Sequence, residues 1–331
     1  MGLKSNKKGL VFIILSVIIT IFFTFIFSSR IGQPIDAKVG LVEARITVLD
    51  NYMDDFFSYA EGAGSVTGYS ALTGVIQDMN LTHSYNPRFD EEFANCTLLG
   101  NLTSTKRCPG MENMTLINYL DQMKAIAEDS LHIIANYTVN QINVTQNFEA
   151  FSVEMLINLT VRITDDYANM TDTRIITSSI NIEGLQDPLY LLNGSYNQTI
   201  INNQLNKKEG DWNYTDLQNL YEQHTYRNYK EGVSFLRRIK GDYALITDYQ
   251  GIESIVNYTA VTYRENQSMI DYLYWNNKTF RCRVPSSPFP EVVGINESIL
   301  PMNGAQYFQL DDDHRLSFGI SPGNTTTTCP P

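Results

Sequence analysis

Residues 151–163 read FSVEMLINLTVRI, a stretch in which apolar and polar side chains alternate. One phase holds Phe, Val, Met, Ile, Leu, Val and Ile, whereas the other holds polar residues and is interrupted only by Leu156. A period of two places the two sets of side chains on opposite faces of a β-strand. The stretch therefore predicts a strand with one buried face and one face in solvent.

The segments on either side predict two further strands. Residues 136–148 and 173–183 are rich in β-branched side chains, and Ile176, Ile180 and Ile182 share one phase. The turn at residues 165–169 reads Asp-Asp-Tyr-Ala-Asn. Because consecutive strands joined by short turns pair antiparallel, we expect a three-stranded β-meander.

Helical periodicity precedes this sheet. Apolar residues recur at steps of four and three, and glycines at 62, 64 and 68 interrupt the pattern. Its positions are Val42, Ile46, Leu49, Met53, Phe56, Ala60, Val66, Tyr69, Leu72 and Ile76. The pattern predicts a long amphipathic helix over residues 28–79, with a kink or close packing at the glycines.

The rest of the chain is assigned by the same reasoning. Residues 116–134 predict a second helix, residues 80–112 a loop and residues 211–238 a largely helical segment. Residues 308–318 predict a final hairpin or strand.

Residues 10–27 read LVFIILSVIITIFFTFIF, eighteen positions without a charge. At about 1.5 Å per residue such a helix is about 27 Å long, close to the thickness of a hydrocarbon core. A cleaved secretory signal has a shorter apolar core that ends in small residues. We therefore expect a transmembrane helix at residues 10–27 that is retained in the lipid bilayer.

Lysines at positions 4, 7 and 8 precede the apolar segment, which predicts a cytoplasmic basic tail at residues 1–9 and an extracellular remainder. The fold class is then α+β: a transmembrane helix is extended by a long amphipathic helix. Residues 80–331 form an extracellular head with a β-meander and packed helices. The expected location is the cell membrane, with a single span.

Hydroxyl side chains form one stripe along the apolar segment, at Ser16, Thr20 and Thr24. Such hydroxyls bond to their own backbone, or they mark a face on which another membrane helix packs. Under the second interpretation, the partners are other membrane helices or copies of this chain.

The chain is dense in Asn-x-Ser/Thr sequons. Its 30 asparagines and 50 serines and threonines would give about four or five by chance, and each sequon alone is a weak motif. Sixteen occur, and all follow residue 28: Asn80, Asn95, Asn101, Asn113, Asn136, Asn143, Asn158, Asn169, Asn193, Asn197, Asn213, Asn257, Asn266, Asn277, Asn296 and Asn324. The excess predicts N-linked glycans on an exported surface.

Four cysteines are compatible with that compartment. Cys96 and Cys108 bracket a short polar loop, which leaves Cys282 and Cys329 for each other; this is one of three possible connectivities. A bridge that closes the short loop stabilises by about 3 kcal/mol in the chain-entropy description.

Charge and motifs argue against several function classes. Removing the charges of the three N-terminal lysines from the net charge of −12 leaves −15 on the remainder, which argues against binding nucleic acid. The four histidines are scattered and no Cys-x-x-Cys occurs, so we expect no zinc site. No nucleophile, zincin or phosphate-loop motif is present, so we expect no cofactor and no catalytic residue.

One acidic run offers an alternative. Asp311 and Asp313 form an Asp-x-Asp arrangement, which in membrane-anchored glycosyltransferases holds a divalent metal. An acidic surface turn is the commoner origin of such a run. The sequence therefore favours a non-enzymatic protein and leaves a membrane-tethered enzyme acting on glycans as the alternative.

The N-terminus carries a resemblance. Lys7-Lys8-Gly9 is followed directly by Leu10-Val-Phe-Ile-Ile. This junction resembles the prepilin-type signal of archaeal and bacterial type IV pilins, in which a membrane peptidase cuts after the glycine. The order of basic segment, apolar helix, extended helix and β-meander is similar to the pilin plan, although Ile14 stands where many pilins carry Glu. The resemblance implies processing between Gly9 and Leu10 and a helix that polymerises or docks.

More broadly, the chain resembles archaeal single-pass surface glycoproteins. Two further stretches are similar to segments of such proteins, Gly184-Leu-Gln-Asp-Pro-Leu-Tyr190 and Gly251-Ile-Glu-Ser254. We therefore expect a membrane-anchored, N-glycosylated cell-surface protein that is a pilin-like structural, adhesion or assembly component.

Overall fold

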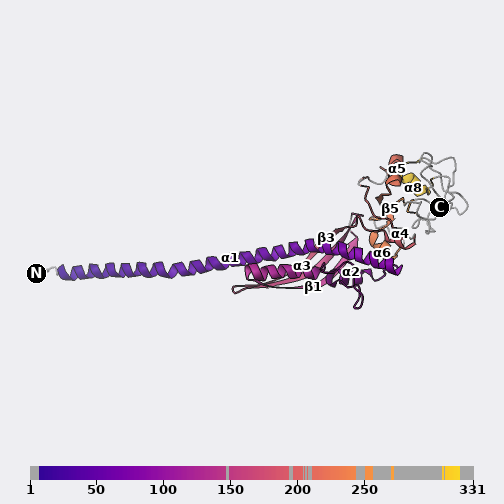
Figure 1. Cartoon of the computed structure of the whole chain (residues 1–331). Coiled ribbons are helices and arrows are strands. Elements are labelled where there is room, and N and C mark those ends of the chain that lie inside the picture. The colour runs from indigo at the N-terminus through magenta and orange to yellow at the C-terminus, as the bar shows by residue number, and fades with distance from the viewer. Residues whose placement is uncertain are drawn as a thin grey trace.

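In the computed structural model, one very long helix leaves a compact body that is built around an antiparallel sheet (Figure 1). The structure describes residues 7–146, 149–193, 197–203, 205, 207, 211–243, 250–255, 270–271, 308 and 310–320. Within these, the side chains of residues 7–18, 22–38, 193, 312 and 313 are not described. The predicted α+β class is confirmed for the described part of the chain.

The sheet contains β1 (Ile134–Gln146), β2 (Ser152–Thr164) and β3 (Asn169–Asn181) in the order β1-β2-β3, with both pairs antiparallel. The predicted meander is therefore confirmed. Along β2 every second side chain from Val153 to Ile163 is fully buried, whereas the side chains between them are partly or fully exposed. Alternation in the sequence thus selected the face that the helices cover.

A β-bulge in β1 keeps two apolar runs on the same face. The register with β2 shifts between Val139 and Gln141. Before the bulge the inward positions are odd-numbered, as at Ala135, and after it they are even-numbered, as at Ile142 and Val144. An extra residue on one strand reverses the phase of everything that follows.

Helix α1 runs from Lys7 to Thr82 without interruption, 76 residues or about 114 Å at about 1.5 Å per residue. Among its described side chains, Leu49 is the first that is fully buried, and buried positions continue to Met79. The predicted extension at residues 28–79 is thus part of one helix that passes through Gly62 and Gly64, and its second half belongs to the core of the body.

Small residues bring α1 close to the sheet. A methyl group at Gly64 would overlap the Ser178 hydroxyl oxygen, and one at Gly68 would overlap the Ile180 side chain. The Ser178 hydroxyl donates a hydrogen bond of 2.8 Å to the Glu61 carbonyl oxygen. Of the two interpretations of these glycines, close packing is the one that the contacts support.

This close contact corrects the predicted apolar seam. Val66 is 48% exposed and Tyr69 is 39% exposed. Neither faces the core, so the prediction is wrong for these two residues. Ala63, Gly64, Thr67 and Gly68 occupy the buried positions instead. Where a helix backbone approaches a sheet closely, only small side chains fit between them, and the large apolar ones turn outward.

Residues 80–112 do not form the predicted loop, because α2 (Phe89–Leu99) lies within them. Phe89, Phe93 and Cys96 are buried on one face of α2, a helical spacing that the turn residues around it obscured. The helix ends at Gly100, whose left-handed φ of 71° favours glycine, and whose N–H donates to the Cys96 carbonyl oxygen.

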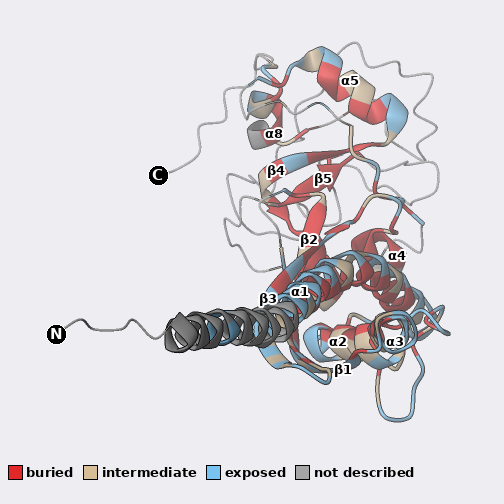
Figure 2. Cartoon of the chain, turned by 90° about the vertical axis from the view of Figure 1, so that its left-hand side faces the viewer, coloured by how far each residue is buried: buried red, intermediate tan, exposed pale blue. Residues whose placement is uncertain are grey.

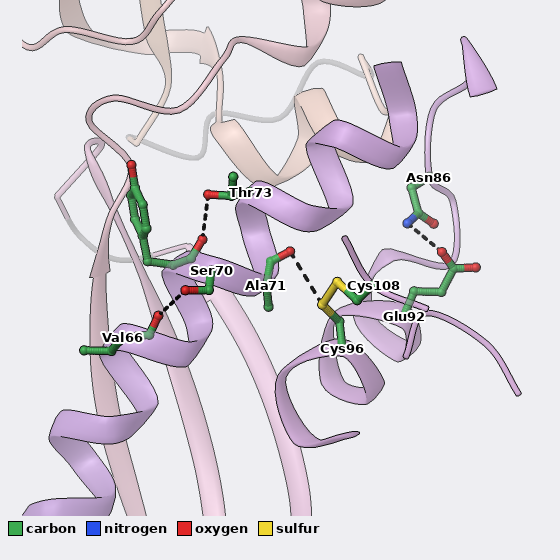
Figure 3. Close-up of a disulfide and its surroundings, with 9 residues drawn as sticks. Val66, Ser70, Ala71, Thr73, Asn86, Glu92, Cys96 and Cys108 are labelled. Carbon is green, nitrogen blue, oxygen red and sulfur yellow. Dashed lines mark hydrogen bonds between the residues drawn. A yellow bond between two sulfur atoms is a disulfide. The ribbon is translucent and has the colours of Figure 1, made fainter. Parts of the chain in front are cut away.

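The predicted Cys96–Cys108 disulfide is present and fastens the loop after α2 (Figure 3). Cys96 Sγ lies 3.8 Å from the Ala71 carbonyl oxygen on α1. A methyl group at Gly74 would lie 2.6 Å from both Cys108 Sγ and the Pro109 carbonyl oxygen. The disulfide is therefore packed directly against the long helix.

The predicted helix at residues 116–134 is shorter than expected. It forms α3 (Leu116–Ile126), capped by Thr115, and the π-helical turn η1 (Ala127–Leu131). His132, with a left-handed φ of 54°, ends it before β1.

The remaining elements form a distal unit, defined here as the described residues from 184 to 320. It contains α4 (Pro188–Asn193), α5 (Tyr214–Gln223), β4 (Tyr226–Val233), α6 (Phe235–Lys240), β5 (Ile252–Ser254) and α8 (Asp312–Ser317). β4 and β5 pair antiparallel. Figure 2 shows α4 of this unit beside the long helix, whereas α5 and α8 lie farthest from that helix.

Two predictions in the distal unit are wrong. Residues 211–238 are not largely helical, because β4 lies between α5 and α6. Residues 308–318 hold the helix α8 and not a strand. Tertiary pairing decides the first case, since β4 is held by β5, which lies some twenty residues later in the sequence.

Gly74→Ala should lower the free energy of unfolding by about 1–3 kcal/mol, because the added methyl group meets a backbone carbonyl and a disulfide sulfur. Denaturant unfolding of the full chain, followed by circular dichroism, measures this. Gly62→Ala is the matched control, since a methyl group at that position would have no neighbour within 4 Å; it should be neutral or stabilise by up to about 1 kcal/mol. Equal effects of the two substitutions would contradict the packing described.

Candidate functional site

The long helix is fastened where it leaves the body. Arg45 Nε lies 2.5 Å from Asp165 Oδ2, and Arg45 Nη2 donates to the Leu131 carbonyl oxygen at 2.7 Å. We call residues 7–44 of α1 the stalk. From here on, the head means the described residues from 45 onward, because α1 joins the core well before the predicted boundary at residue 80. Arg45 thus ties the base of the stalk to the β2–β3 turn and to the end of η1.

The acidic partner is part of the turn itself. Asp165 Oδ1 also accepts hydrogen bonds from the backbone N–H groups of Tyr167 and Ala168. Burial alone would raise the pKa of Asp165, but the Tyr167 N–H and the Arg45 guanidinium hold it below its usual value.

The stalk presents apolar side chains that nothing in the head covers. None of the described side chains at residues 19–21 and 39–44 is buried. Val39 and Leu41 are 52% and 55% exposed, and Ile46 and Val48 at the junction with the head are also exposed. A lone helix with exposed apolar residues is a surface that other helices or lipid can cover.

Among the residues that the structure describes, no helix combines the length and apolar character needed to cross a membrane. Most of residues 10–27 have side chains outside the described set, so the predicted span stays a prediction. Gly9 and Leu10 lie within α1, and cleavage between them likewise stays a prediction. Of the hydroxyl stripe, Thr20 is exposed, whereas the side chains of Ser16 and Thr24 lie outside the described set.

The distal unit contains a fully buried ionic cluster around Arg238. Its Nη1 lies 2.6 Å from Asp187 Oδ2 and its Nη2 lies 2.5 Å from Asp271 Oδ2, with all three side chains 0% exposed. Tyr226 and Tyr190 donate their hydroxyl hydrogens to Asp187 and Asp271. The cluster joins α4, β4 and α6 to residue 271.

Two carboxylates share the one guanidinium, so their repulsion remains. Burial and the neighbouring Asp187 raise the pKa of Asp271 to about 6, although the Arg238 charge opposes this. The same two carboxylates hold the pKa of Arg238 well above its usual value, even though burial alone would lower it.

A second buried chain of contacts holds α8 in place. His314 Nε2 lies 2.8 Å from Glu253 Oε2, and His314 Nδ1 lies 2.6 Å from Asp311 Oδ2. Glu253 Oε1 also lies 2.6 Å from the Arg227 guanidinium. Burial alone would lower the pKa of His314, but the two carboxylates raise it to about 10.

An aromatic enclosure surrounds this arginine. The Arg227 guanidinium carbon lies 4.0 Å from the Phe318 ring centre, 4.9 Å from that of Trp212 and 5.0 Å from that of Tyr229. The cation that these three rings surround is therefore a side chain of the protein itself. The Arg238 cluster is fully buried, whereas in the second chain of contacts Asp311 is 18% exposed. Both clusters hold together elements that are far apart in the sequence.

The structure places the metal candidates in this framework. Asp311 caps α8 by accepting from the His314 backbone N–H, and its other oxygen faces the His314 ring. The Asp313 side chain lies outside the described set. Among the described residues, no group of three or more His, Cys, Asp or Glu side chains is arranged to hold a metal ion.

The sequon asparagines are accessible wherever the structure describes them. Asn80, Asn113, Asn136, Asn143, Asn169, Asn197 and Asn213 are exposed, and Asn95, Asn101 and Asn158 are partly exposed. The side chain of Asn193, and all of Asn257, Asn266, Asn277, Asn296 and Asn324, lie outside the described residues, as do Cys282 and Cys329.

A hollow of about 730 Å³ lies beside the disulfide loop. It is lined by residues from the end of α2, from the loop and from the start of α3, and its only charged lining side chains are Arg107 and Glu112. This set holds no nucleophile with an adjacent base, so the hollow has no catalytic arrangement.

Reasoning from the sequence missed both ionic clusters. Their members are single charged residues scattered from 187 to 314, and no spacing links them. The stretches Gly184–Tyr190 and Gly251–Ser254, which stand out in the sequence, contain Asp187, Tyr190 and Glu253. A methyl group at Gly251 would overlap the Gly232 carbonyl oxygen, so this glycine allows β4 and β5 to approach.

Arg238→Met should lower the free energy of unfolding by about 3–5 kcal/mol, because it leaves two buried carboxylates without a countercharge. Fluorescence of the buried Trp212 during denaturant unfolding is the measurement. Lys240→Met is the control, since the side chains of the Lys240–Asp90 pair are 30% and 64% exposed and such a pair contributes at most about 1 kcal/mol. An Arg238→Met effect as small as that of the control would contradict the cluster.

Because the pKa of His314 is raised, we expect the free energy of unfolding to fall at alkaline pH. Because its pKa is raised in the folded state, its contribution is complete below the unfolded value of about 6.5 and is lost as the pH rises towards 10. One proton sets a limit of about 1.4 kcal/mol per pH unit on the slope. His314→Asn should flatten the stability profile between pH 6.5 and 10, whereas His132→Asn at an exposed position should leave it unchanged.

Comparison with known proteins yields no match: no protein-family model, no curated protein and no solved structure matches this chain.

Proposed function

We propose that this chain is a membrane-anchored, N-glycosylated cell-surface protein of pilin-like build, whose stalk carries the head away from the bilayer and serves as its assembly surface. The observation that carries the proposal is the continuity of α1. One helix includes the apolar segment at residues 10–27 and continues into the core of the head.

Helix geometry supports the role of a spacer. From the end of the apolar segment to the base of the head, residues 28–44 span about 25 Å at about 1.5 Å per residue. The Arg45–Asp165 pair and the Gly64–Ser178 contact fix the direction in which the helix leaves the head. A rigid connection of this kind holds the head at a set distance from whatever binds the N-terminal end.

Exposed apolar residues support assembly through the stalk. Val39 and Leu41 lie beyond the reach of the head and are more than half exposed. Helices of neighbouring copies, or of other membrane proteins, would bury these side chains at a gain of about 25 cal/mol per Å² of apolar surface.

Two further features support an extracytoplasmic head. The Cys96–Cys108 disulfide is typical of an oxidising compartment. All described sequon asparagines are at least partly exposed, so a glycan on each would project into solvent. No observation favours the enzymatic alternative, because Asp311 is engaged with His314.

Membrane fractionation of the full chain tests the anchor. The wild-type chain should remain in the membrane pellet after an alkaline wash, whereas Ile14→Lys with Ile18→Lys should release it, since each lysine at the centre of a span costs about 2.5–3.5 kcal/mol. Val39→Lys with Leu41→Lys is the control. It should stay in the pellet and reduce chemical cross-linking between copies.

Two outcomes would contradict the proposal. A wild-type chain that appears in the soluble fraction would remove the anchor, and cross-linking that is unaffected at Val39 and Leu41 would remove the stalk as an assembly surface. N-terminal sequencing of the same material reports processing, because cleavage of the prepilin type predicts a mature start at Leu10.

A further inference from the structure

The sheet has one face that no described element covers. Helices pack on the face that carries Val153 to Ile163, and the opposite side chains of β2 from Glu154 to Thr164 are all partly or fully exposed. Register places five rows of three side chains on this open face. They are Thr145, Glu154 and Ser179; Asn143, Leu156 and Thr177; Gln141, Asn158 and Ile175; Thr138, Thr160 and Thr173; and Asn136, Arg162 and Thr171.

The composition of the open face is unusual for a protein surface. Eleven of its fifteen side chains are Asn, Gln, Ser or Thr, and only Glu154 and Arg162 are charged. Solvent-facing surfaces that resist association ordinarily carry charges of both signs on about 25–35% of their side chains. This face lacks that protection, and Ile175 within it is 68% exposed.

Sequon asparagines are concentrated on the same face. Asn136, Asn143 and Asn158 lie within the five rows, and Asn169 lies at the start of β3 beside Thr164. Asn143 and Asn158 are diagonal neighbours on adjacent strands, a relation that corresponds to about 7–8 Å. Their modifications would therefore stand side by side above the centre of the sheet.

Hydrogen bonding leaves the relevant atom of each asparagine available. Asn169 Oδ1 accepts from Arg162 Nε, a group that only donates, so its amide nitrogen points away. Asn143 Oδ1 accepts from Gln141, and Asn158 Oδ1 accepts from Asn140. Among the described residues, none of these three, nor Asn136, donates through Nδ2, the atom to which an N-glycan is joined.

Asn140 provides the contrast within the same sheet. It sits at the bulge, it has no sequon, and its Nδ2 donates to Asn158 Oδ1 at 3.1 Å and to Thr160 Oγ1 at 2.9 Å. An asparagine whose amide nitrogen bonds to the sheet thus lies among asparagines whose amide nitrogens donate to no described residue.

We propose that the open face of the sheet is a glycan-bearing face, on which N-glycans at Asn136, Asn143, Asn158 and Asn169 cover the uncharged polar rows and keep them from contact with other proteins. The inference rests on the proposed extracytoplasmic position of the head. It goes beyond that position because it selects four of the sixteen sequons and assigns them a common role.

Site-resolved mass spectrometry of the native full chain tests the occupancy. Peptides that contain the four asparagines should carry glycan mass, and Asn136→Gln, Asn143→Gln and Asn158→Gln should each remove one glycan from the intact mass. Asn140→Gln should remove none. Where a glutamine variant fails to fold, Thr138→Val, Thr145→Val or Thr160→Val removes the same sequon and keeps a strand-forming residue of similar shape.

The outcomes separate this inference from the proposed function. Bare sheet peptides together with glycans at Asn80, Asn113 or Asn213 would overturn the glycan-bearing face and leave the proposed function standing. A chain without any glycan would overturn both the inference and the glycosylation in the proposed function, whereas the membrane fractionation would still decide the anchor.

Self-association tests the covering role. The triple variant Asn136→Gln, Asn143→Gln and Asn158→Gln should sediment faster than the native chain at equal concentration, because the uncharged face is then open. The matched triple Asn80→Gln, Asn95→Gln and Asn197→Gln removes three sequons elsewhere, at exposed or partly exposed positions, and should not sediment faster than the native chain. Equal sedimentation of the two triple variants would overturn the covering role.

Discussion

The contact between the small-residue face of α1 and the sheet is the constraint on which the rest of the molecule depends. Gly64 and Gly68 allow the helix backbone to approach Ser178 and Ile180 so closely that a methyl group would not fit. At this distance the direction of the helix is set by the sheet. A stalk that leaves the head at a fixed angle follows from this contact, and so does the outward position of Val66 and Tyr69.

The distal unit is stabilised differently. Its regular elements are short, and β4 and β5 form only a two-stranded sheet. Two buried ionic clusters connect elements that are far apart in the sequence, with Arg238 holding Asp187 and Asp271, and Glu253 joining Arg227 to His314. Burying charge is costly, and close pairing with further hydrogen bonds offsets that cost. Removing one charged partner should therefore lower the free energy of unfolding by more than the complete cluster adds to it.

Three parts of the chain thus have distinct chemistry. The described side chains of the stalk are mostly apolar, the open face of the sheet is polar and almost uncharged, and the ionic groups around Arg238 and Arg227 in the distal unit are buried. In the proposed function, the stalk meets the membrane and other helices. If glycans cover the open face of the sheet as inferred, that face is not available for contacts with other proteins. Assembly would then occur through the stalk.

The sequence by itself determined the sheet and the short-range disulfide. Alternation in residues 151–163 fixed β2 and its buried face, because the side-chain period of a strand is a local property. The short sequence separation of 12 favoured the bridge between Cys96 and Cys108 among the three possible connectivities. Tertiary structure alone decided the bulge at Val139–Gln141, the helix α2 within an apparent loop, and β4 within an apparent helix. It also decided the role of Asp311. The Asp-x-Asp motif made this residue a candidate metal ligand, but in the structure it caps α8 and contacts the His314 ring. The physical reason is the same in each case. Contacts between residues that are distant in the sequence outweigh local conformational preferences, and a local sequence pattern does not show which distant residues will be in contact.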